Sequence, residues 1–271
     1  MKRFFCIAAL FLAACDKPAP GTSGGSGTST AEPSPREPKP LKPEPVQPRL
    51  YVTANGSDTP QIPAGWPLVL TVSVHAPGSD PMKLEAPSGS WASLVHLALP
   101  DAAWKPRPLE FAARSITLDA VSSGLLMWTM TPEELDAIPR GTYRILATLE
   151  VPESGSVRGQ AATVKLVKAL PKLTPEQDVE RSRLLVTVLR ARADAAGAEQ
   201  EADALLERLP ASSGAILLRV DLFEAAGKRP EAVALLDRAI DAAVGGAPTP
   251  KNWPRDLARR REELAEKDRQ K

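Results

Sequence analysis

The sequence has little of the residue types from which catalytic and metal sites are usually built. Its 271 residues include two histidines and two cysteines, and only 4% of them are aromatic. His75 and His96 are far from each other and from any cysteine, so no zinc-binding spacing is present. We therefore expect no metal, no cofactor and no catalytic residues, and we predict that the protein is not an enzyme.

The two cysteines lie near the N-terminus and cannot cross-link a domain. Cys6 belongs to an apolar run, Phe4 to Ala14, that follows two basic residues. This layout is typical of a secretory signal, because the run is too short for a permanent membrane helix. Cleavage after residue 14 leaves Cys15 alone, so the mature chain cannot form an internal disulfide.

The signal ends in Leu12-Ala13-Ala14-Cys15, which resembles the lipobox of bacterial lipoproteins. The resemblance implies a signal peptide over 1–14 and acyl chains such as palmitate on Cys15, which anchor the protein to a cell-envelope membrane. Each buried methylene contributes about 0.8 kcal/mol, so two or three chains anchor stably. The alternative is an ordinary secretory signal that happens to contain a cysteine.

Two further features bear on location and partners. Asp16 resembles the inner-membrane retention signal of enteric bacteria, a rule that varies between lineages, so inner versus outer membrane stays open. The folded domains are expected outside the cytoplasm. Loss of residues 1–14 lowers the basic residues from 34 to 32 against 33 acidic ones, a formal net charge of −1. We therefore expect no nucleic-acid partner.

The segment after the anchor is predicted to be a disordered tether over 15–48. Residues 21–30 are rich in Gly, Ser and Thr, and in 31–48 prolines alternate with charged residues. Such a segment cannot bury a core, and its proline-rich part could reach about 50 Å as a polyproline II helix. Gly21-Thr22-Ser23-Gly24-Gly25 matches G-x-S-x-G, but that motif acts on a strand-to-helix turn beside a histidine.

A β-sandwich is predicted over 49–168. In 68–75 the even-numbered residues are apolar and the odd-numbered ones mostly polar, which is the period of a strand and places His75 on the polar side. Turn signals such as Asn55-Gly56 and Arg140-Gly141 separate further candidates. About seven short strands in roughly 120 residues favour a sandwich. The other strand candidates are Leu50–Ala54, Trp91–Leu99, Pro108–Ala112, Ser115–Leu118, Leu125–Thr129, Tyr143–Leu149 and Gln160–Val167.

One segment of this region resembles the E–F crossover of immunoglobulin-like domains. Thr131-Pro132-Glu133-Glu134 predicts an N-cap, a proline at the first helical position and a capping-box glutamate. A short turn then leads to Tyr143. The resemblance implies an immunoglobulin-like sandwich in which the Tyr143 hydroxyl bonds back to the corner.

After the sandwich the apolar spacing becomes helical, and we predict an α-helical repeat-like domain over 174–268. Thr174 to Gln177 is a second capping box, Gly197 and Gly227 are expected to end helices, and Pro230 to open one. A last helix runs from Asn252 to about Lys267. The overall expectation is therefore a multidomain all-β plus all-α protein.

Two of these helices share a pattern. Ala202-(x)3-Leu206-(x)2-Leu209 matches Ala232-(x)3-Leu236-(x)2-Ala239, so the predicted repeat aligns position 202 with position 232. The pattern resembles the second helix of tetratricopeptide repeats. Its offset of 30 residues, from 202 to 232, is shorter than that family's period of about 34 residues. The resemblance covers about 175–245 and implies a small stack of helix pairs. A plain helical bundle with an Ala/Leu core is the alternative.

Tryptophans are the candidate ligand contacts, because exposed indoles can stack on sugar rings. Core packing is the default expectation for a tryptophan, and Trp91 and Trp128 are predicted to lie in the core. Trp104, in a loop after Asp101, is the best candidate for an exposed contact. The loop carboxylates Asp101, Asp119 and Asp136 form no calcium-binding string, and turn or capping roles explain them better.

These observations favour a membrane-anchored envelope lipoprotein that acts as a non-enzymatic protein-binding or scaffold module. The expected partner is an envelope protein, bound through the helical grooves or the edge of the sandwich. The alternative is a lipoprotein that binds peptidoglycan or another polysaccharide through the β-sandwich, with Trp104 as a contact.

Overall fold

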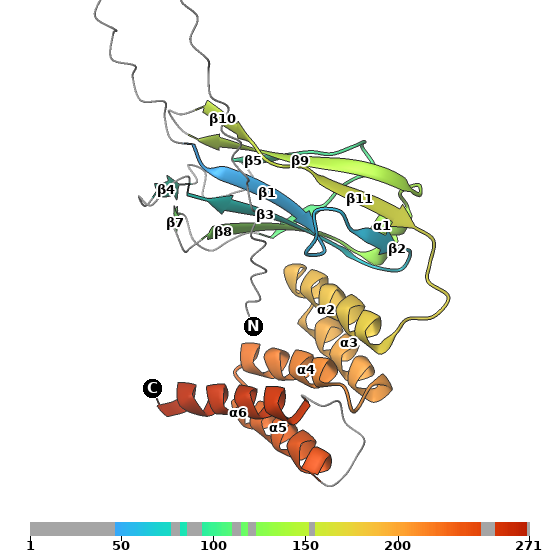
Figure 1. Cartoon of the computed structure of the whole chain (residues 1–271), viewed down its shortest axis with the longest axis vertical. Coiled ribbons are helices and arrows are strands. Elements are labelled where there is room, and N and C mark those ends of the chain that lie inside the picture. Colours follow the sequence, from blue (N-terminus) through green and yellow to red (C-terminus); the bar gives the residue numbers. More distant parts are fainter. Residues whose placement is uncertain are drawn as a thin grey trace, which may run out of the picture. The chain divides into compact units, whose positions relative to one another are not determined.

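The computed structural model describes residues 47–76, 82–85, 94–109, 115–118, 123–151, 155–244 and 253–269. β-Sheets occupy the described chain up to Val167, and α-helices follow (Figure 1). The predicted order of an all-β part and an all-α part is therefore confirmed. Cys15, Asp16 and the predicted tether up to residue 46 lie outside the described residues. None of the helices in the ranges above is long and apolar enough to cross a membrane.

The β-part contains two main sheets, which share one apolar core. The first is antiparallel in the order β1 (Arg49–Ala54), β3 (Leu68–His75), β8 (Ser123–Met130) and β6 (Arg107–Leu109). The second has the order β10 (Gly155–Arg158), β9 (Gly141–Val151), β11 (Ala162–Val167) and β2 (Gln61–Pro63). Strand β5 (Val95–Ala98) also pairs with β9. A separate pair joins β4 and β7: Met82–Glu85 and Ser115–Leu118.

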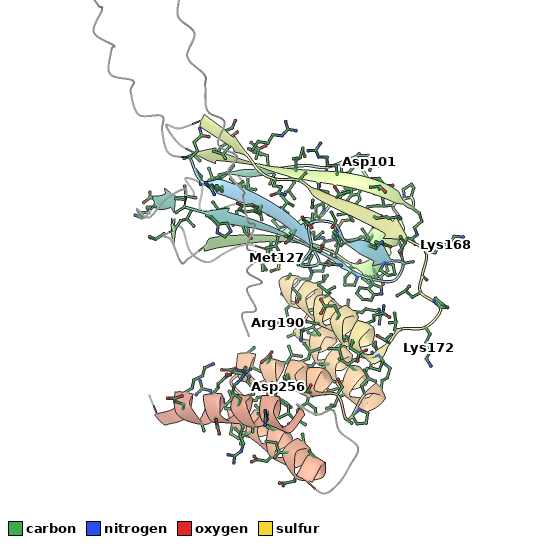
Figure 2. All side chains as sticks on the ribbon, viewed as in Figure 1. Asp101, Met127, Lys168, Lys172, Arg190 and Asp256 are labelled. Atoms are coloured by element: carbon green, nitrogen blue, oxygen red, sulfur yellow. The ribbon has the colours of Figure 1, made fainter. Side chains whose placement is uncertain are left out.

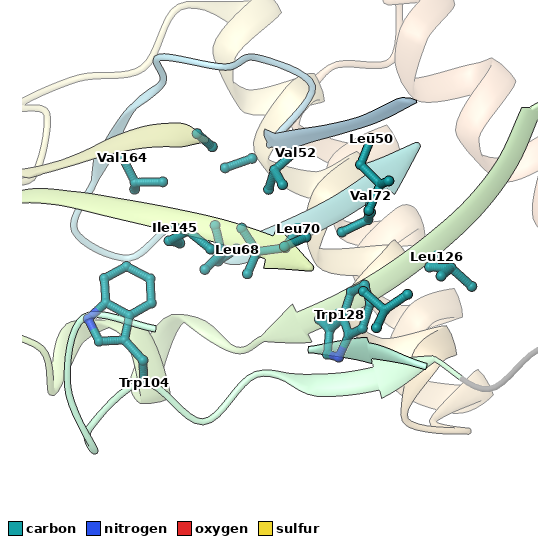
Figure 3. Close-up of a cluster of buried hydrophobic side chains, with 14 of the residues drawn as sticks. Leu50, Val52, Leu68, Leu70, Val72, Trp104, Leu126, Trp128, Ile145 and Val164 are labelled. Carbon is teal, nitrogen blue, oxygen red and sulfur yellow. The ribbon is translucent and has the colours of Figure 1, made fainter. Parts of the chain in front are cut away.

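The alternation along β3 determines what enters the core. Leu68, Leu70, Val72 and Val74 are buried there, as the strand period predicts, and they meet residues of β9 and β11 such as Ile145 and Val164 (Figure 3). Asn55 and Gly56 form the predicted turn, both with positive φ. The Asn55 side chain strengthens this turn, since its Oδ1 accepts from the Val69 amide at 2.8 Å.

The predicted corner is confirmed in detail. The helix α1 (Pro132–Asp136) begins with a complete capping box between Thr131 and Glu134. The Tyr143 hydroxyl donates a hydrogen bond to the carbonyl oxygen of Pro139 at 2.6 Å. The turn between α1 and β9 is thereby fixed by a side chain of the strand that follows it.

The all-α part comprises α2 (Pro175–Ala191), α3 (Ala195–Arg208), α4 (Ser213–Ala225), α5 (Arg229–Val244) and α6 (Trp253–Arg269). The capping box at Thr174 is confirmed, and Gly227 follows α4 with φ +73° as predicted. The prediction for Gly197 is wrong. That glycine lies in the first turn of α3, where its amide is capped by Asp194, and Ala193 takes the left-handed conformation after α2.

The helices form two equivalent pairs, α2 with α3 and α4 with α5. α3 begins at Ala195 and α5 at Arg229, and α2 ends at Ala191 and α4 at Ala225. Both boundaries therefore give the same offset of 34 residues, from 195 to 229 and from 191 to 225. We call this the structural offset. It aligns Ala195 with Arg229 and Ala191 with Ala225.

The same backbone hydrogen bond lies at the end of the first helix in each pair. In the first pair the amide of Asp194 donates to the Leu189 oxygen at 2.9 Å, and at the equivalent place in the second pair Lys228 donates to Phe223 at 2.8 Å. The alignment of Ala202 with Ala232 that the sequence suggested is therefore wrong. The structural equivalent of Ala232 is Ala198, one helical turn before Ala202.

Candidate functional site

Trp104 is not the exposed contact that the sequence suggested. Its side chain is 2% exposed and belongs to the sandwich core (Figure 3). Asp101 organises a tight turn, in which its Oδ1 accepts from the Ala103 amide at 2.8 Å. This turn directs the indole inward onto Tyr143, with ring centroids 5.1 Å apart in an edge-to-face arrangement. Burial of the large apolar ring stabilises the fold more than its exposure to water would. Trp128 is buried as predicted, and Trp91 lies outside the described residues.

The two histidines have ordinary surface partners. His75 meets Tyr51 edge to face at a centroid distance of 5.4 Å, on the side of β1 and β3 away from the core. His96 Nε2 lies 3.3 Å from a Glu150 carboxylate oxygen, and both side chains are exposed. Among the residues placed by the structure, no group of three or more His, Cys, Asp or Glu could hold a metal ion. Asp119, one of the loop carboxylates, lies outside them.

The described surface has an open hollow of about 530 Å³ on one face of α3, which we call the acidic hollow. Three carboxylates spaced four residues apart point along it, because residues four apart share a helix face. The other side chains that line the hollow are small or uncharged. The lining residues are Ala196, Glu199, Gln200, Asp203, Ala204 and Glu207. From the sequence alone, such a face is indistinguishable from any solvated helix surface.

One side of the acidic hollow is held in place by a buried arginine. Arg219 on α4 forms ion pairs in which its Nε lies 2.8 Å from Asp203 Oδ1 and its Nη1 lies 3.4 Å from a Glu199 carboxylate oxygen. Its guanidinium also stacks over the Phe223 ring at 4.3 Å. Asp203 remains exposed beside this pairing, and Glu207 and Gln200 are also exposed on α3. The hollow therefore combines fixed carboxylates on one side with freely accessible polar groups on the other.

A second feature is the contact between the sandwich and α2, which we call the seam. Val69 and Met127, on the outer side of β3 and β8, pack with Trp66 against Leu184 and Val188 of α2 (Figure 2 labels Met127). Val69 was expected on the polar side of its strand. It is buried because α2 covers it.

Polar contacts surround the apolar residues of the seam. Arg192 donates to Glu134, Arg107 lies 3.7 Å from the same carboxylate, and Arg181 Nε donates to the Gly65 oxygen at 3.1 Å. Burial alone would raise the pKa of Glu134. The hydrogen bonds from Arg192 and the Thr131 amide, with the nearby arginine charges, outweigh burial and hold that pKa below its ordinary value. Glu134 is thus ionised and links the two parts.

No protein-family model matches the chain, and no curated protein matches it. The cupredoxin domain of amoB from Nitrosocaldus yellowstonii is 12% identical over 40% of this chain and 61% of its own, with a TM-score of 0.23. The CARDB domain of a Pyrococcus furiosus protein is 18% identical over 45% of this chain and 97% of its own, with a TM-score of 0.25.

Proposed function

We propose that the chain is a cell-envelope lipoprotein anchored through Cys15, whose folded parts act as a non-enzymatic scaffold that binds a partner protein. The observation that carries the proposal is the repeated helix pair, since stacked helix pairs present extended binding surfaces. The anchor rests on the lipobox-like sequence. Replacing Cys15 with alanine should move the protein from the membrane fraction to the soluble fraction, and continued membrane association would contradict the anchor.

The helical part of this proposal is a tetratricopeptide-like stack. Its support is the structural offset, which equals the period of that family. Fully buried alanines, Ala198 and Ala232, occupy equivalent positions in α3 and α5. An aspartate at a second equivalent position pairs with an arginine of the next helix, Asp203 with Arg219 and Asp237 with Arg261. The equivalent alanines and aspartates favour a repeat array over a plain bundle.

The acidic hollow is the proposed contact for a basic segment of the partner. Opposite charges across an interface speed association and reject wrong partners. Gln200 and Glu207 are exposed there and lie outside the ion pairs that Glu199 and Asp203 make with Arg219. The exposed pair would meet a partner without disturbing the packing of α3 on α4.

The experiment is in-cell crosslinking of the native lipidated protein, followed by capture and mass spectrometry. The test variant is Gln200→Lys, and the control is Ala234→Lys, which adds the same charge at the equivalent exposed position of α5. We expect one stoichiometric envelope protein, whose yield falls about tenfold in the test variant alone. Equal yields from the two variants would exclude the hollow. Absence of any envelope protein at stoichiometric yield would exclude the scaffold function.

A second candidate function, glycan binding, is favoured by Tyr51. Its side chain is 39% exposed on the sandwich, with His75 at its edge. An exposed ring beside a polar group suits stacking on a sugar. Binding to isolated cell walls should fall in Tyr51→Ala and not in Leu170→Ala, which removes an exposed side chain elsewhere. Undiminished binding of Tyr51→Ala would rule out this contact.

A further inference from the structure

The two residues of α2 that contact the sandwich have equivalents in α4. By the structural offset, Leu184 corresponds to Leu218 and Val188 to Leu222. In α4 this pair packs on the preceding helix pair, in a cluster that includes Val186, Ala198, Ala202 and Leu205. In α2 the same positions pack instead on Val69, Trp66 and Met127 of the sandwich.

We infer that the outer face of the sheet β1-β3-β8-β6 takes the place of a preceding helix pair and caps the helical array. A helix inside an array must be covered on both neighbouring sides, and an end helix needs a cap. Without the sheet, Leu184 and Val188 would be exposed to water. The sandwich is therefore a structural cap of the helical array and is joined to it by packing as well as by the linker.

The composition of the sheet face fits this role. On its outward side β3 presents Val69, and the adjacent strand β8 presents Met127. Farther along β3 the outward residues Thr71, Ser73 and His75 are polar and only partly buried. Among these outward residues of β3, Val69 alone is apolar and buried, and it lies where α2 contacts the sheet.

Polar contacts fix the position of α2 on this patch. The carboxylate of Glu134 already accepts from the Thr131 amide at 2.9 Å, so it stands in one orientation when it meets Arg192. Arg181 bonds the Gly65 oxygen, and the Gly65 amide in turn donates to Asp136 at 3.0 Å. These contacts link α2 to the loop before β3 and to α1.

The opposite end of the array is closed by α6. Its Leu257 and Leu264 are buried with Ile216 and Leu236 of the second pair. The outward residues of α6 are charged and exposed, namely Arg255, Arg259, Glu262 and Glu266. A polar outer face ends an array, because it offers no surface for another repeat. In the described part of the chain, α6 thus closes an array of two helix pairs.

The test is to separate the two parts without removing either. A specific protease site is placed in the exposed linker between Lys168 and Lys172 of the full mature chain (Figure 2), and the cleaved protein is examined by size-exclusion chromatography. We expect the halves to remain together. In Val69→Asp we expect them to separate, because a buried unpaired carboxylate is strongly unfavourable.

Ser73→Asp is the control, since it adds the same charge to the same face of β3 outside the seam. The cleaved Ser73→Asp protein should remain associated, and circular dichroism before cleavage should show that both variants are folded. Separation of the wild-type halves on cleavage would overturn the inference. Val69→Asp halves that stay together as tightly as wild type would also overturn it. Neither result depends on the proposed partner protein.

Discussion

Glu134 accepts a hydrogen bond from Arg192 across the seam, between residues that are 58 positions apart in the chain. The same carboxylate completes the capping box of α1 through the Thr131 amide. One side chain therefore orders a corner of the sandwich and binds the first long helix to it.

The first prediction concerns the pH dependence of this link. The folded-state pKa of Glu134 lies below its ordinary value, so the ionised form contributes stability that is fully present above the unfolded pKa of about 4.3. That contribution is lost as the pH falls through the folded pKa. Glu134→Gln, which can still cap Thr131, should lower the melting temperature at pH 7 and have progressively less effect below about pH 4.

The matched control for this prediction is Glu133→Gln, since Glu133 is the exposed neighbour of Glu134. The difference in melting temperature between each variant and wild type is measured by circular dichroism from about pH 3 to about pH 7, a range that includes the ordinary glutamate pKa. A loss of melting temperature in Glu134→Gln that is the same at every pH would show that charge at this position is irrelevant.

The second prediction is that Tyr143→Phe destabilises the sandwich by about 1 kcal/mol, because one intramolecular hydrogen bond contributes roughly this amount. The substitution removes the hydrogen bond to the Pro139 oxygen and keeps the ring that packs on Trp104. Urea unfolding measures it, with Tyr51→Phe as the control because its ring lies on the sheet surface. Equal stability of Tyr143→Phe and wild type would mean that the corner does not depend on this bond.

Much of the fold could be predicted because its signals are local. Strand alternation in 68–75, the capping boxes at Thr131 and Thr174, and the tyrosine corner each depend on a few adjacent residues. The strands that sequence reasoning missed, β2, β4 and β10, have three or four residues each. Such short segments show little periodicity, although β7, which also has four residues, was predicted.

The errors have physical causes of another kind. Residues four apart share a helix face, so a repeat pattern shifted by one turn looks almost the same. The sequence therefore matched Ala232 with Ala202, whereas the structure matches it with Ala198, one turn earlier. Similarly, a glycine near a helix boundary can end one helix or begin the next. Gly197 begins one because Asp194 caps its amide.

The candidate site was harder to predict because it depends on tertiary contacts. α2 is covered on two sides, by the sheet through Leu184 and Val188 and by α3 through Val186. A helix buried on two sides loses the simple amphipathic pattern. Trp104 became the candidate contact for a related reason, since whether a loop indole turns inward depends on Tyr143, which is far away in sequence.

The third prediction follows from the burial of Trp104. Trp104→Ala should destabilise the β-part by about 3–5 kcal/mol, because it removes a large side chain from a packed core. The indole is not available to a ligand, so binding of cell-wall fragments per folded molecule should not change. Urea unfolding gives the stability, and sedimentation with isolated cell walls gives the binding. A fully stable variant with reduced binding would restore Trp104 as a surface contact.

The fourth prediction uses the equivalence of Ala193 and Gly227, which follow α2 and α4 and are related by the structural offset. Both residues are left-handed, with φ of +59° and +73°. An L-residue pays roughly 1–2 kcal/mol for this conformation, whereas glycine adopts it freely and loses more entropy on folding. Ala193→Gly should therefore stabilise the protein by up to about 1 kcal/mol, and Gly227→Ala should destabilise it by a similar amount.

The two substitutions are mutual controls, because they exchange the same residues at equivalent positions of one array. Chemical unfolding of each variant and of the double variant measures them, and the double variant should be close to wild type in stability. The positions lie in different helix pairs, so their effects should be nearly additive. Two changes of the same sign would show that the ends of α2 and α4 are not equivalent, and would remove one support for a repeat array.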